Sequence, residues 1–259
     1  MIKIAGFSVS QTSPTFMLVK WYLESTIEDL TQYVVNAYRG ELPSTNIADY
    51  TLLTTTPLSA NEYTEYYDTG ITGLTNKFDT YTYLIQVVNK NTNVTVTSNP
   101  TTLAITGDQF AKRIIYLREL VLRRKSGANF KILKRKTYGT LCPVCYDSTL
   151  QLTTNSKCMT CYDTKFVGGF YTPYIVRGQF NNAPPRSVIT TYGNWEDEDG
   201  ILVMSNKPIL SPSDVIVDPF GKRWNVLTIR STNKSFFLIS QSAQCRLIET
   251  DSILYSVPA

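Results

Sequence analysis

The sequence predicts a mainly β protein, in which β-rich regions at the two ends are separated by one helix and a segment with four cysteines. Residues that favour strands are abundant, with 34 Thr, 17 Tyr and 11 Phe among 259 residues, and charged residues make up only 18%. Because β-branched and aromatic side chains pack well on a pleated surface, this composition favours sheets over helices. Short apolar or alternating runs separated by turn-forming residues occur in both end regions.

The N-terminal region, residues 1–106, contains about seven such runs. They lie at residues 4–10, 15–23, 32–38, 50–54, 63–68, 80–88 and 94–105, and Gly, Pro, Asn and Ser residues fall between them. Short strands with turns at intervals of roughly 8–12 residues are typical of a β-sandwich. We therefore expect residues 1–106 to form a β-sandwich.

Particular residues of this region resemble the fibronectin type III family. Trp21 ends an apolar run where that family has its core tryptophan, Tyr33 opens the next strand, and Leu74 followed by Tyr81 resembles the family's tyrosine-corner segment. The family's proline between that Leu and Tyr is missing, and the spacing is one residue longer. The resemblance implies a fibronectin type III-like sandwich that binds, spaces or decorates, and it implies no reaction. An unrelated β-sandwich is the alternative.

Residues 107–136 are predicted to form one basic amphipathic helix and a linker. Asp108 lies where an acidic residue caps a helix and complements its dipole. Phe110, Ile114, Leu117 and Val121 then recur at helical spacing, and Ile115, Leu120 and Leu122 widen this apolar stripe, which predicts an amphipathic helix.

The same segment concentrates the positive charge of the chain. It carries 10 basic and 2 acidic residues, a net charge of +8, whereas residues 1–106 carry −4 and residues 137–259 carry 0. We predict that its cations face a partner or DNA: Lys112, Arg113, Arg118, Arg123, Arg124, Lys125, Lys131, Lys134, Arg135 and Lys136. One interpretation is a linker helix facing solvent or acidic partner subunits. The other is a surface along which nucleic acid passes.

Residues 137–165 contain the strongest local motif, a pair of CxxC sequences. Cys142 and Cys145 form the first pair, and Cys158 and Cys161 form the second. Four thiolates in two close pairs match a structural tetrahedral zinc site, and the segment resembles a zinc ribbon. Disulfides are the alternative, which a cytoplasmic origin disfavours. A catalytic zinc is disfavoured because four cysteines fill the coordination shell, while Cys245 is expected to be a free thiol.

The C-terminal region, residues 166–259, is predicted to form a small β-barrel. Asp218 to Gly221 has the composition of a hairpin turn, and Trp224 after it is expected to pack in the core. The order Val-Ile-Val-Asp, Gly, Arg-Trp-x-Val, Gln and a terminal Tyr-x-Val-Pro resembles small β-barrels of head-completion and head-to-tail connector proteins of tailed bacteriophages. The resemblance covers about 50 residues and is loose in sequence.

Composition and motifs together favour a structural role over an enzymatic one. The chain has no histidine, which removes the commonest general base and every Ser–His or Cys–His nucleophile pair. No nucleotide-binding or hydrolase motif is present, so we predict no catalytic residues. No apolar run reaches the length of a membrane span and the first residues lack a secretory signal, so we expect no membrane association.

The resemblances imply a virion protein of a tailed bacteriophage, made in the host cytoplasm. The leading hypothesis is a neck (head-to-tail connector) subunit, forming a homo-oligomeric ring on the portal around the DNA channel. Its expected partners are the portal, other neck or tail proteins and, non-specifically, genomic DNA. The alternatives are a tail or baseplate structural subunit and a zinc-ribbon nucleic-acid-binding protein.

Overall fold

The computed structural model is mainly β, with 48% of residues in strands. It describes residues 2–25, 29–44, 46–71, 80–104, 108–149, 152–182, 186–190, 193–197, 199–234 and 236–259. Leu74, named above for its resemblance to the tyrosine-corner segment, lies outside these residues. The chain divides into two compact units: residues 1–112 with 138–141, and residues 113–137 with 142–259.

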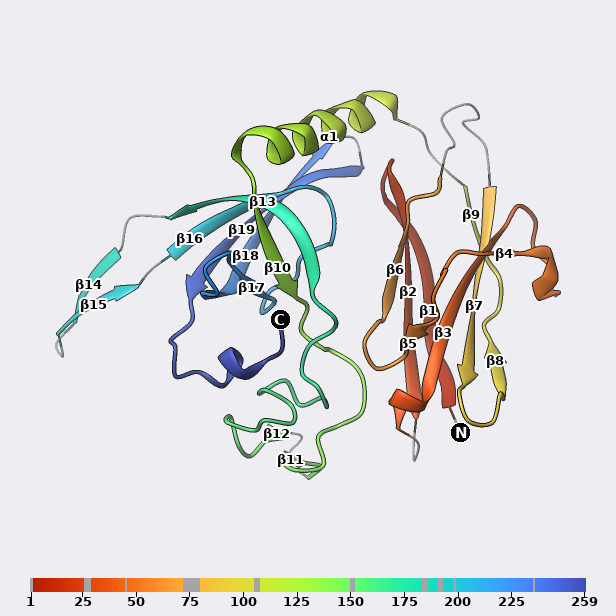
Figure 1. The fold of residues 1–259 in the computed structure, drawn as a ribbon, viewed down its shortest axis with the longest axis horizontal. Helices are drawn as coiled ribbons and strands as arrows, with labels where there is room; N and C mark the ends of the chain where they lie inside the picture. The colour runs from red at the N-terminus through yellow and green to blue at the C-terminus, as the bar shows by residue number, and fades with distance from the viewer. Residues whose placement is uncertain are drawn as a thin grey trace. The chain divides into compact units, whose positions relative to one another are not determined.

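The first unit contains two antiparallel sheets that share one core (Figure 1). One sheet has the order β1 (Ile2–Ser13), β2 (Phe16–Ser25), β6 (Glu65–Asp68). The other has the order β4 (Thr51–Leu52), β3 (Tyr33–Gly40), β7 (Thr80–Asn89), β8 (Thr95–Thr97), with β5 (Leu58–Ser59) on β3 and β9 (Thr101–Ala104) on β7. Short 3-10 turns lie at Leu30–Gln32 and Ile47–Asp49.

Side chains from both sheets form the core of this unit. Trp21 and Val19 of β2 are fully buried in the same cluster as Val35 of β3 and Tyr83 and Ile85 of β7. Trp21 and Val35 alternate with more exposed neighbours, whereas Val19, Tyr83 and Ile85 lie in stretches of β2 and β7 whose successive residues are buried. The expected burial of Trp21 is therefore confirmed.

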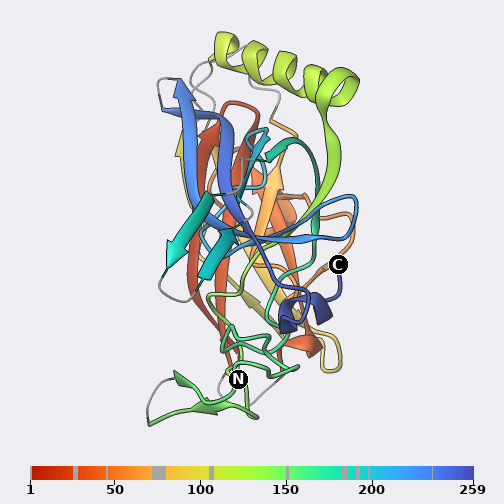
Figure 2. The ribbon, with the colours of Figure 1, turned by 90° about the vertical axis from the view of Figure 1, so that its left-hand side faces the viewer.

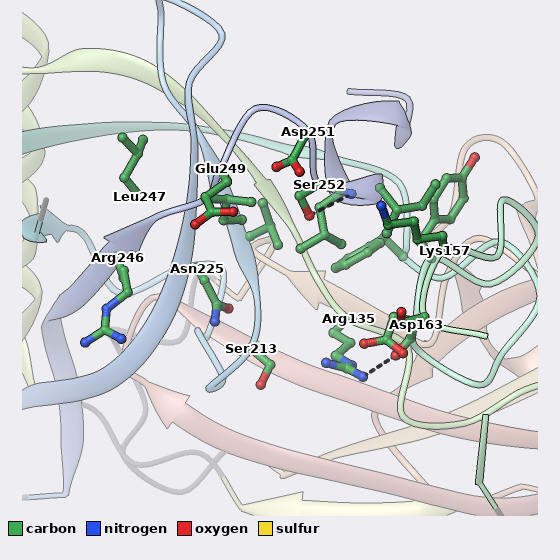
Figure 3. A pocket seen from close by; sticks show the side chains of 17 residues that line it. Arg135, Lys157, Asp163, Ser213, Asn225, Arg246, Leu247, Glu249, Asp251 and Ser252 are labelled. Atoms are coloured by element: carbon green, nitrogen blue, oxygen red, sulfur yellow. Dashed lines mark hydrogen bonds between the residues drawn. The ribbon is translucent and has the colours of Figure 1, made fainter. Parts of the chain in front are cut away.

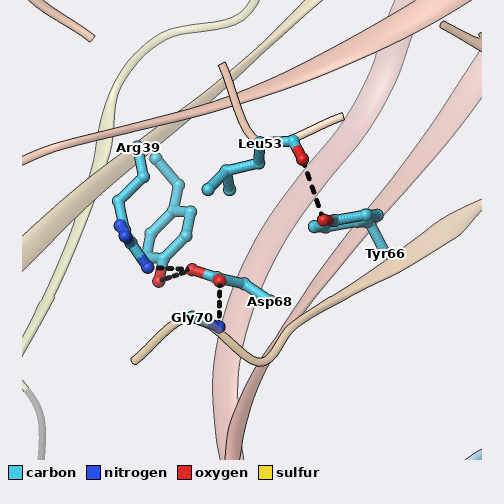
Figure 4. A network of polar contacts seen from close by, with 6 residues as sticks. Arg39, Leu53, Tyr66, Asp68 and Gly70 are labelled. Carbon is cyan, nitrogen blue, oxygen red and sulfur yellow. Dashed lines mark hydrogen bonds and ion pairs between the residues drawn. The ribbon is translucent and has the colours of Figure 1, made fainter. Parts of the chain in front are cut away.

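A buried carboxylate closes one end of this core (Figure 4). Asp68 is 2% exposed and accepts hydrogen bonds from Arg39 Nη1 at 2.8 Å, Tyr83 Oη at 2.9 Å and the Gly70 amide at 2.9 Å. Burial, together with the charge of Asp68, raises the pKa of Tyr83 well above its usual value. Because a buried charge is costly unless it is paired and hydrogen-bonded, this network fixes how β3, β6 and β7 meet.

One α-helix, α1 (Gln109–Val121), is present among the described residues, and a π-turn, Leu122–Ser126, extends it. The Asp108 carboxylate accepts a hydrogen bond from the Ala111 amide at 2.9 Å, so the predicted cap is confirmed. No helix in the described part of the chain has the length and apolar character needed to cross a membrane.

The buried face of α1 is only one edge of the predicted apolar stripe. Ile115 and Leu122, which widen that stripe, are buried together with Ala111. Leu117 is 48% and Val121 51% exposed, so the centre of the predicted stripe does not face the core.

The second unit is built on a closed six-stranded barrel. Its strands are β10 (Ala128–Leu133), β13 (Tyr174–Asn182), β16 (Asp199–Met204), β19 (Phe237–Leu247), β18 (Arg223–Lys234) and β17 (Val215–Val217), in that order around the barrel. Antiparallel pairing of β10 with β17 closes it. The predicted barrel is thus present, and residues 128–133, expected to be part of a linker, form its first strand.

Smaller elements are attached to this barrel. β14 (Arg186–Thr190) and β15 (Gly193–Asp197) pair as a separate ribbon between β13 and β16, and β11 (Tyr146–Asp147) pairs with β12 (Leu152–Thr153) between β10 and β13. A 3-10 turn, Ile253–Ser256, ends the chain.

The barrel core contains a set of aromatic side chains. Trp224 is 2% exposed, as predicted, and its ring lies 4.6 Å from that of Phe180. A Cβ on Gly200 would lie 2.2 Å from Phe180 Cζ, so only glycine fits beside this ring. The predicted turn is also present: Asp218 Oδ1 accepts hydrogen bonds from the Phe220 and Lys222 amides, each at 2.9 Å.

Candidate metal centre

The four clustered cysteines lie in a module, residues 134–173, inserted between β10 and β13 (Figure 1). The β11–β12 hairpin separates the two CxxC pairs, as the sequence predicts. In both ribbon views this hairpin lies at the end of the second unit away from the last turns of α1 (Figure 2). The barrel therefore holds the two ends of the module, and the cysteines hold its middle.

The four thiols converge on one point. Cys142 Sγ lies 3.8 Å from Cys158 Sγ, and Cys145 Sγ lies 3.2 Å from Cys161 Sγ. All four sulfur atoms lie within 4.8 Å of one another. Four sulfurs at about 2.3 Å from a tetrahedral ion are separated by about 3.8 Å, whereas a disulfide bond is about 2.05 Å long. The cluster thus fits a metal ion, and its cysteines are free thiols in the structure.

Burial closes the site on all sides. The four cysteines are at most 4% exposed. Within the described residues they form the one group of three or more potential ligands, and the chain has no histidine to exchange for a thiolate. A tetrahedral shell filled by four thiolates leaves no position for water or substrate, so the arrangement suits a structural ion.

The two CxxC pairs repeat the same backbone hydrogen bonds. The Tyr146 amide donates to Cys142 O at 3.2 Å, and the Tyr162 amide donates to Cys158 O at 2.9 Å. Thr154 donates to Cys145 O through both its amide and its hydroxyl, and Thr164 does the same to Cys161 O. The two halves therefore share these bonds, but the threonine that contacts the second cysteine comes from beyond the β11–β12 hairpin in one half and from three residues on in the other.

The electrostatic environment of the thiols is uneven. Backbone amides of Thr160 and Cys161 point at the Cys158 sulfur and lower its pKa to about 6. Burial and the neighbouring sulfurs raise the pKa of Cys145 well above its usual range. Because thiolates are the metal-binding form, a bound cation is what allows all four cysteines to be ionised in so small a volume.

Part of the predicted basic segment attaches this module to the barrel. Lys134 and Lys136 are 8% and 4% exposed. The Lys136 ammonium donates to Val167 O at 2.9 Å and lies 5.6 Å from the centre of the Tyr171 ring, and Arg135 Nη2 donates to Asp163 O at 2.7 Å. Arg135 and Lys136 thus contact the module, and the prediction that Lys134 and Lys136 face a partner or DNA is wrong because both side chains are buried.

The remaining cations of the segment lie on or near the surface. Arg113, Arg124, Lys125 and Lys131 are exposed, and Lys112 is half-buried. Arg118 donates to Ser240 Oγ on β19, and Arg123 pairs with Glu119 at 3.6 Å. The basic segment of the sequence is therefore divided in the structure. Its cations on α1, the turn after it and β10 are mostly exposed, whereas Lys134 and Lys136 at the base of the module are buried.

A pocket of about 500 Å³ lies where the module meets the barrel and the C-terminal segment (Figure 3). Arg135, Lys157 and Arg246 line it, but so do Asp163 and Glu249. Because the lining contains both positive and negative side chains, the pocket has no clear preference for an anionic or a cationic ligand. No catalytic arrangement of these residues is apparent from their contacts.

The sequence did not predict a structural role for two buried polar residues. Arg223 donates to Leu254 O and to Val257 O, the latter at 2.7 Å, and so clamps the last turn of the chain onto β18. Gln241 donates to Pro208 O at 2.8 Å and accepts from the Leu210 amide at 2.9 Å. Both lie in the connector-like motif, which could have identified them because a buried polar group needs hydrogen-bond partners.

Comparison with models of known protein families finds no match to this chain, and comparison with curated protein sequences finds none either. The case for any function therefore depends on the geometry described above and on the sequence resemblances.

Proposed function

We propose that the chain is a non-enzymatic structural subunit of a tailed-bacteriophage virion, placed in the neck as part of a ring on the portal. The observation that carries this proposal is the closed six-stranded barrel, to which the segment with the connector-like motif contributes β17, β18 and β19. Within that motif, Trp224 packs in the core, and the terminal Tyr255 and Val257 are held by Arg223. Trp224, Arg223, Tyr255 and Val257 thus each have a structural reason to occur in this barrel.

The N-terminal unit supports the same proposal as an accessory domain. Its two antiparallel sheets with a buried Trp21 are compatible with a fibronectin type III-like sandwich. Domains of this kind usually bind or space rather than react. We propose that it is a peripheral domain of the subunit.

We further propose that the ion at the four cysteines is zinc and that it serves folding. Zinc favours tetrahedral sites made only of thiolates, although iron also occupies such sites. Metal analysis of native protein should give close to one zinc per chain. A preparation that contains iron instead, or one that is metal-free and still has the four thiols protected from alkylation, contradicts this assignment.

The position of the protein in a particle tests the neck assignment directly. Antibodies to the chain, or imaging of virions that carry it fused to a dense tag, should label the junction between head and tail. Labelling of the tail tip or baseplate would replace the proposal by the tail-subunit alternative. Absence of the chain from purified virions would reject both.

The nucleic-acid alternative requires a different test from the one the sequence suggests. Replacing Lys134 and Lys136 would disturb the fold, because both are buried. Arg124, Lys125 and Lys131 are exposed and are the appropriate targets. If the protein binds duplex DNA with a steep salt dependence, and Ala at these three positions reduces both the affinity and the salt slope, the nucleic-acid function gains support.

A further inference from the structure

The outer face of α1 is apolar at its centre and basic around it. Leu117 and Val121 are 48% and 51% exposed, and the neighbouring Tyr116 is 64% exposed. Ile114, Leu117 and Val121 follow spacings of three and four residues, which place them along one line of the helix. A second line, roughly 100° away around the helix, is formed by Ala111, Ile115 and Leu122, which are buried. The helix therefore has one face for its own fold and one that remains exposed.

The spacing of the outer face is that of a helix-packing seam. Apolar residues that alternate three and four positions apart allow a second helix to lie alongside, with its side chains inserted between them. An isolated exposed Leu needs no explanation, whereas several in line, beside charged residues, mark an interaction site.

The charge around this face specifies the partner. Residues 109–126 contain six basic residues and one acidic residue. Arg113 and Arg124 are exposed near the apolar line. Two copies of α1 packed against each other would bring like charges together, which disfavours self-association through this face. No other α-helix occurs in the part of the chain that the structure describes.

Nucleic acid fits this surface less well than protein does. Phosphate groups are bound by cations and polar groups, and a central line of Leu, Val and Ile would lie against them without benefit. Of the two runs of three consecutive cations, residues 134–136 are mostly buried, and residues 123–125 are exposed but follow the end of the apolar line at Val121.

We propose that the outer face of α1 is a docking surface for an amphipathic helix of a different protein, one with an apolar seam flanked by Asp or Glu residues. This inference builds on the proposed function, since a neck subunit must bind neighbours of another kind, and it assigns that contact to α1. The partner's carboxylates pair with Arg113 and Arg124, and its apolar side chains cover Leu117 and Val121.

A designed peptide provides the probe. A four-heptad helix with Leu at the two seam positions and Glu at the flanking positions should bind the full-length, metal-loaded protein, as measured by fluorescence anisotropy. The same peptide with Lys in place of Glu should bind at least about tenfold more weakly because of like-charge repulsion, and raising the salt concentration should reduce this difference.

Variants locate the binding on α1. Leu117→Ser together with Val121→Ser should weaken the acidic peptide at least about tenfold, because each removes apolar area that the complex would bury. Leu152→Ser is the matched control, since Leu152 is 58% exposed in β12 and lies away from α1. Arg113→Glu with Arg124→Glu should reverse the preference between the two peptides.

Three results would overturn the inference. They are equal binding of both peptides, binding unaffected by the α1 variants, and sedimentation showing that the protein self-associates through this face in a way that Leu117→Ser abolishes. Duplex DNA that binds more tightly than the acidic peptide and protects α1 would assign the face to nucleic acid instead. If the peptides do not bind as expected but the chain is found in the neck of virions, only the role of α1 is rejected. If the acidic peptide binds as expected but the chain is absent from virions, only the neck assignment is rejected.

Discussion

Lys136 provides the sharpest test of the structure, because the sequence and the fold assign it opposite roles. The sequence places it in a basic run expected to face DNA or a partner, whereas the structure buries it beneath residues 167–171. Its ammonium donates to Val167 O at 2.9 Å and lies 5.6 Å from the centre of the Tyr171 ring. Its backbone amide also donates to Gly169 O at 2.9 Å.

Lys136→Met keeps most of the apolar stem and removes the charge. A hydrogen bond from a charged group contributes about 1.5–3 kcal/mol, and a cation–π contact contributes about 0.5–1 kcal/mol. The variant also avoids the cost of burying an ammonium, which offsets part of this loss. We expect a net destabilisation of about 2 kcal/mol, or a fall of about 4–8 °C in the melting temperature of the second unit.

Lys131→Met is the matched control, since Lys131 is an exposed lysine on β10 of the same segment. It should change stability by no more than about 0.5 kcal/mol. Calorimetry of the metal-loaded protein measures both variants, and competition with a chelator measures metal retention. We expect retention to fall in Lys136→Met, because Val167 and Gly168 follow the second CxxC pair and Gly168 N donates to Thr160 O at 2.8 Å. Equal melting temperatures for the two variants, or a greater loss in Lys131→Met, would refute the placement of Lys136.

Three further predictions concern the thiols, the C-terminal clamp and the buried carboxylate. The four clustered cysteines should resist alkylation in the native metal-loaded protein and become reactive after chelation. Cys245, whose pKa burial raises to about 12, should react only after denaturation. Mass spectrometry that finds Cys245 labelled together with the other four after chelation would contradict this. Arg223→Met should leave two carbonyls of the last turn without their donor, lower the free energy of unfolding by about 2–4 kcal/mol and speed hydrogen exchange after residue 250, so unchanged exchange there would exclude the clamp. Burial raises the pKa of Tyr83, so the folded state keeps the Tyr83 phenol protonated. The stability that the protonated phenol contributes is therefore complete below pH ~10 and is lost as the pH rises further. Tyr83→Phe should therefore lower stability at neutral pH by about 1 kcal/mol through loss of the bond to Asp68 and flatten the alkaline decline, and an unchanged alkaline limb would count against this account.

The parts of the fold that depend on local sequence could be predicted. The spacing of two CxxC pairs led to the four-cysteine cluster, and the order of apolar runs led to a β-rich N-terminal unit and a C-terminal barrel. Asp218 to Gly221 and the buried Trp224 were also evident, because a turn and the strand after it are adjacent in the chain. These features need only a few neighbouring residues to be recognised.

Features that depend on distant contacts could not be predicted. A run of lysines looks exposed in the sequence, and only the return of residues 167–171 over Lys136 makes it internal. The helix has a wide apolar stripe, and no local pattern says which part of it becomes buried; in the structure the buried residues are Ala111, Ile115 and Leu122. The strand at 128–133 was expected to be a linker because its partners in the barrel, β13 and β17, lie far along the chain.

The place of the metal module in the barrel also follows from physical constraints. β10 and β13 are antiparallel neighbours, with Ile132 opposite Tyr174, so the barrel already brings the ends of residues 134–173 together. Lengthening a loop whose ends are held costs little additional entropy, and the barrel therefore tolerates the insertion. The module has almost no core of its own beyond the cysteines and Tyr146. Its order must therefore come from an ion at the four cysteines and from contacts at its base, where Arg135, Lys136 and the apolar packing of Phe170 and Tyr162 join it to the barrel. Loss of the ion should accordingly disorder residues around the four cysteines while the barrel, with its separate core, stays folded.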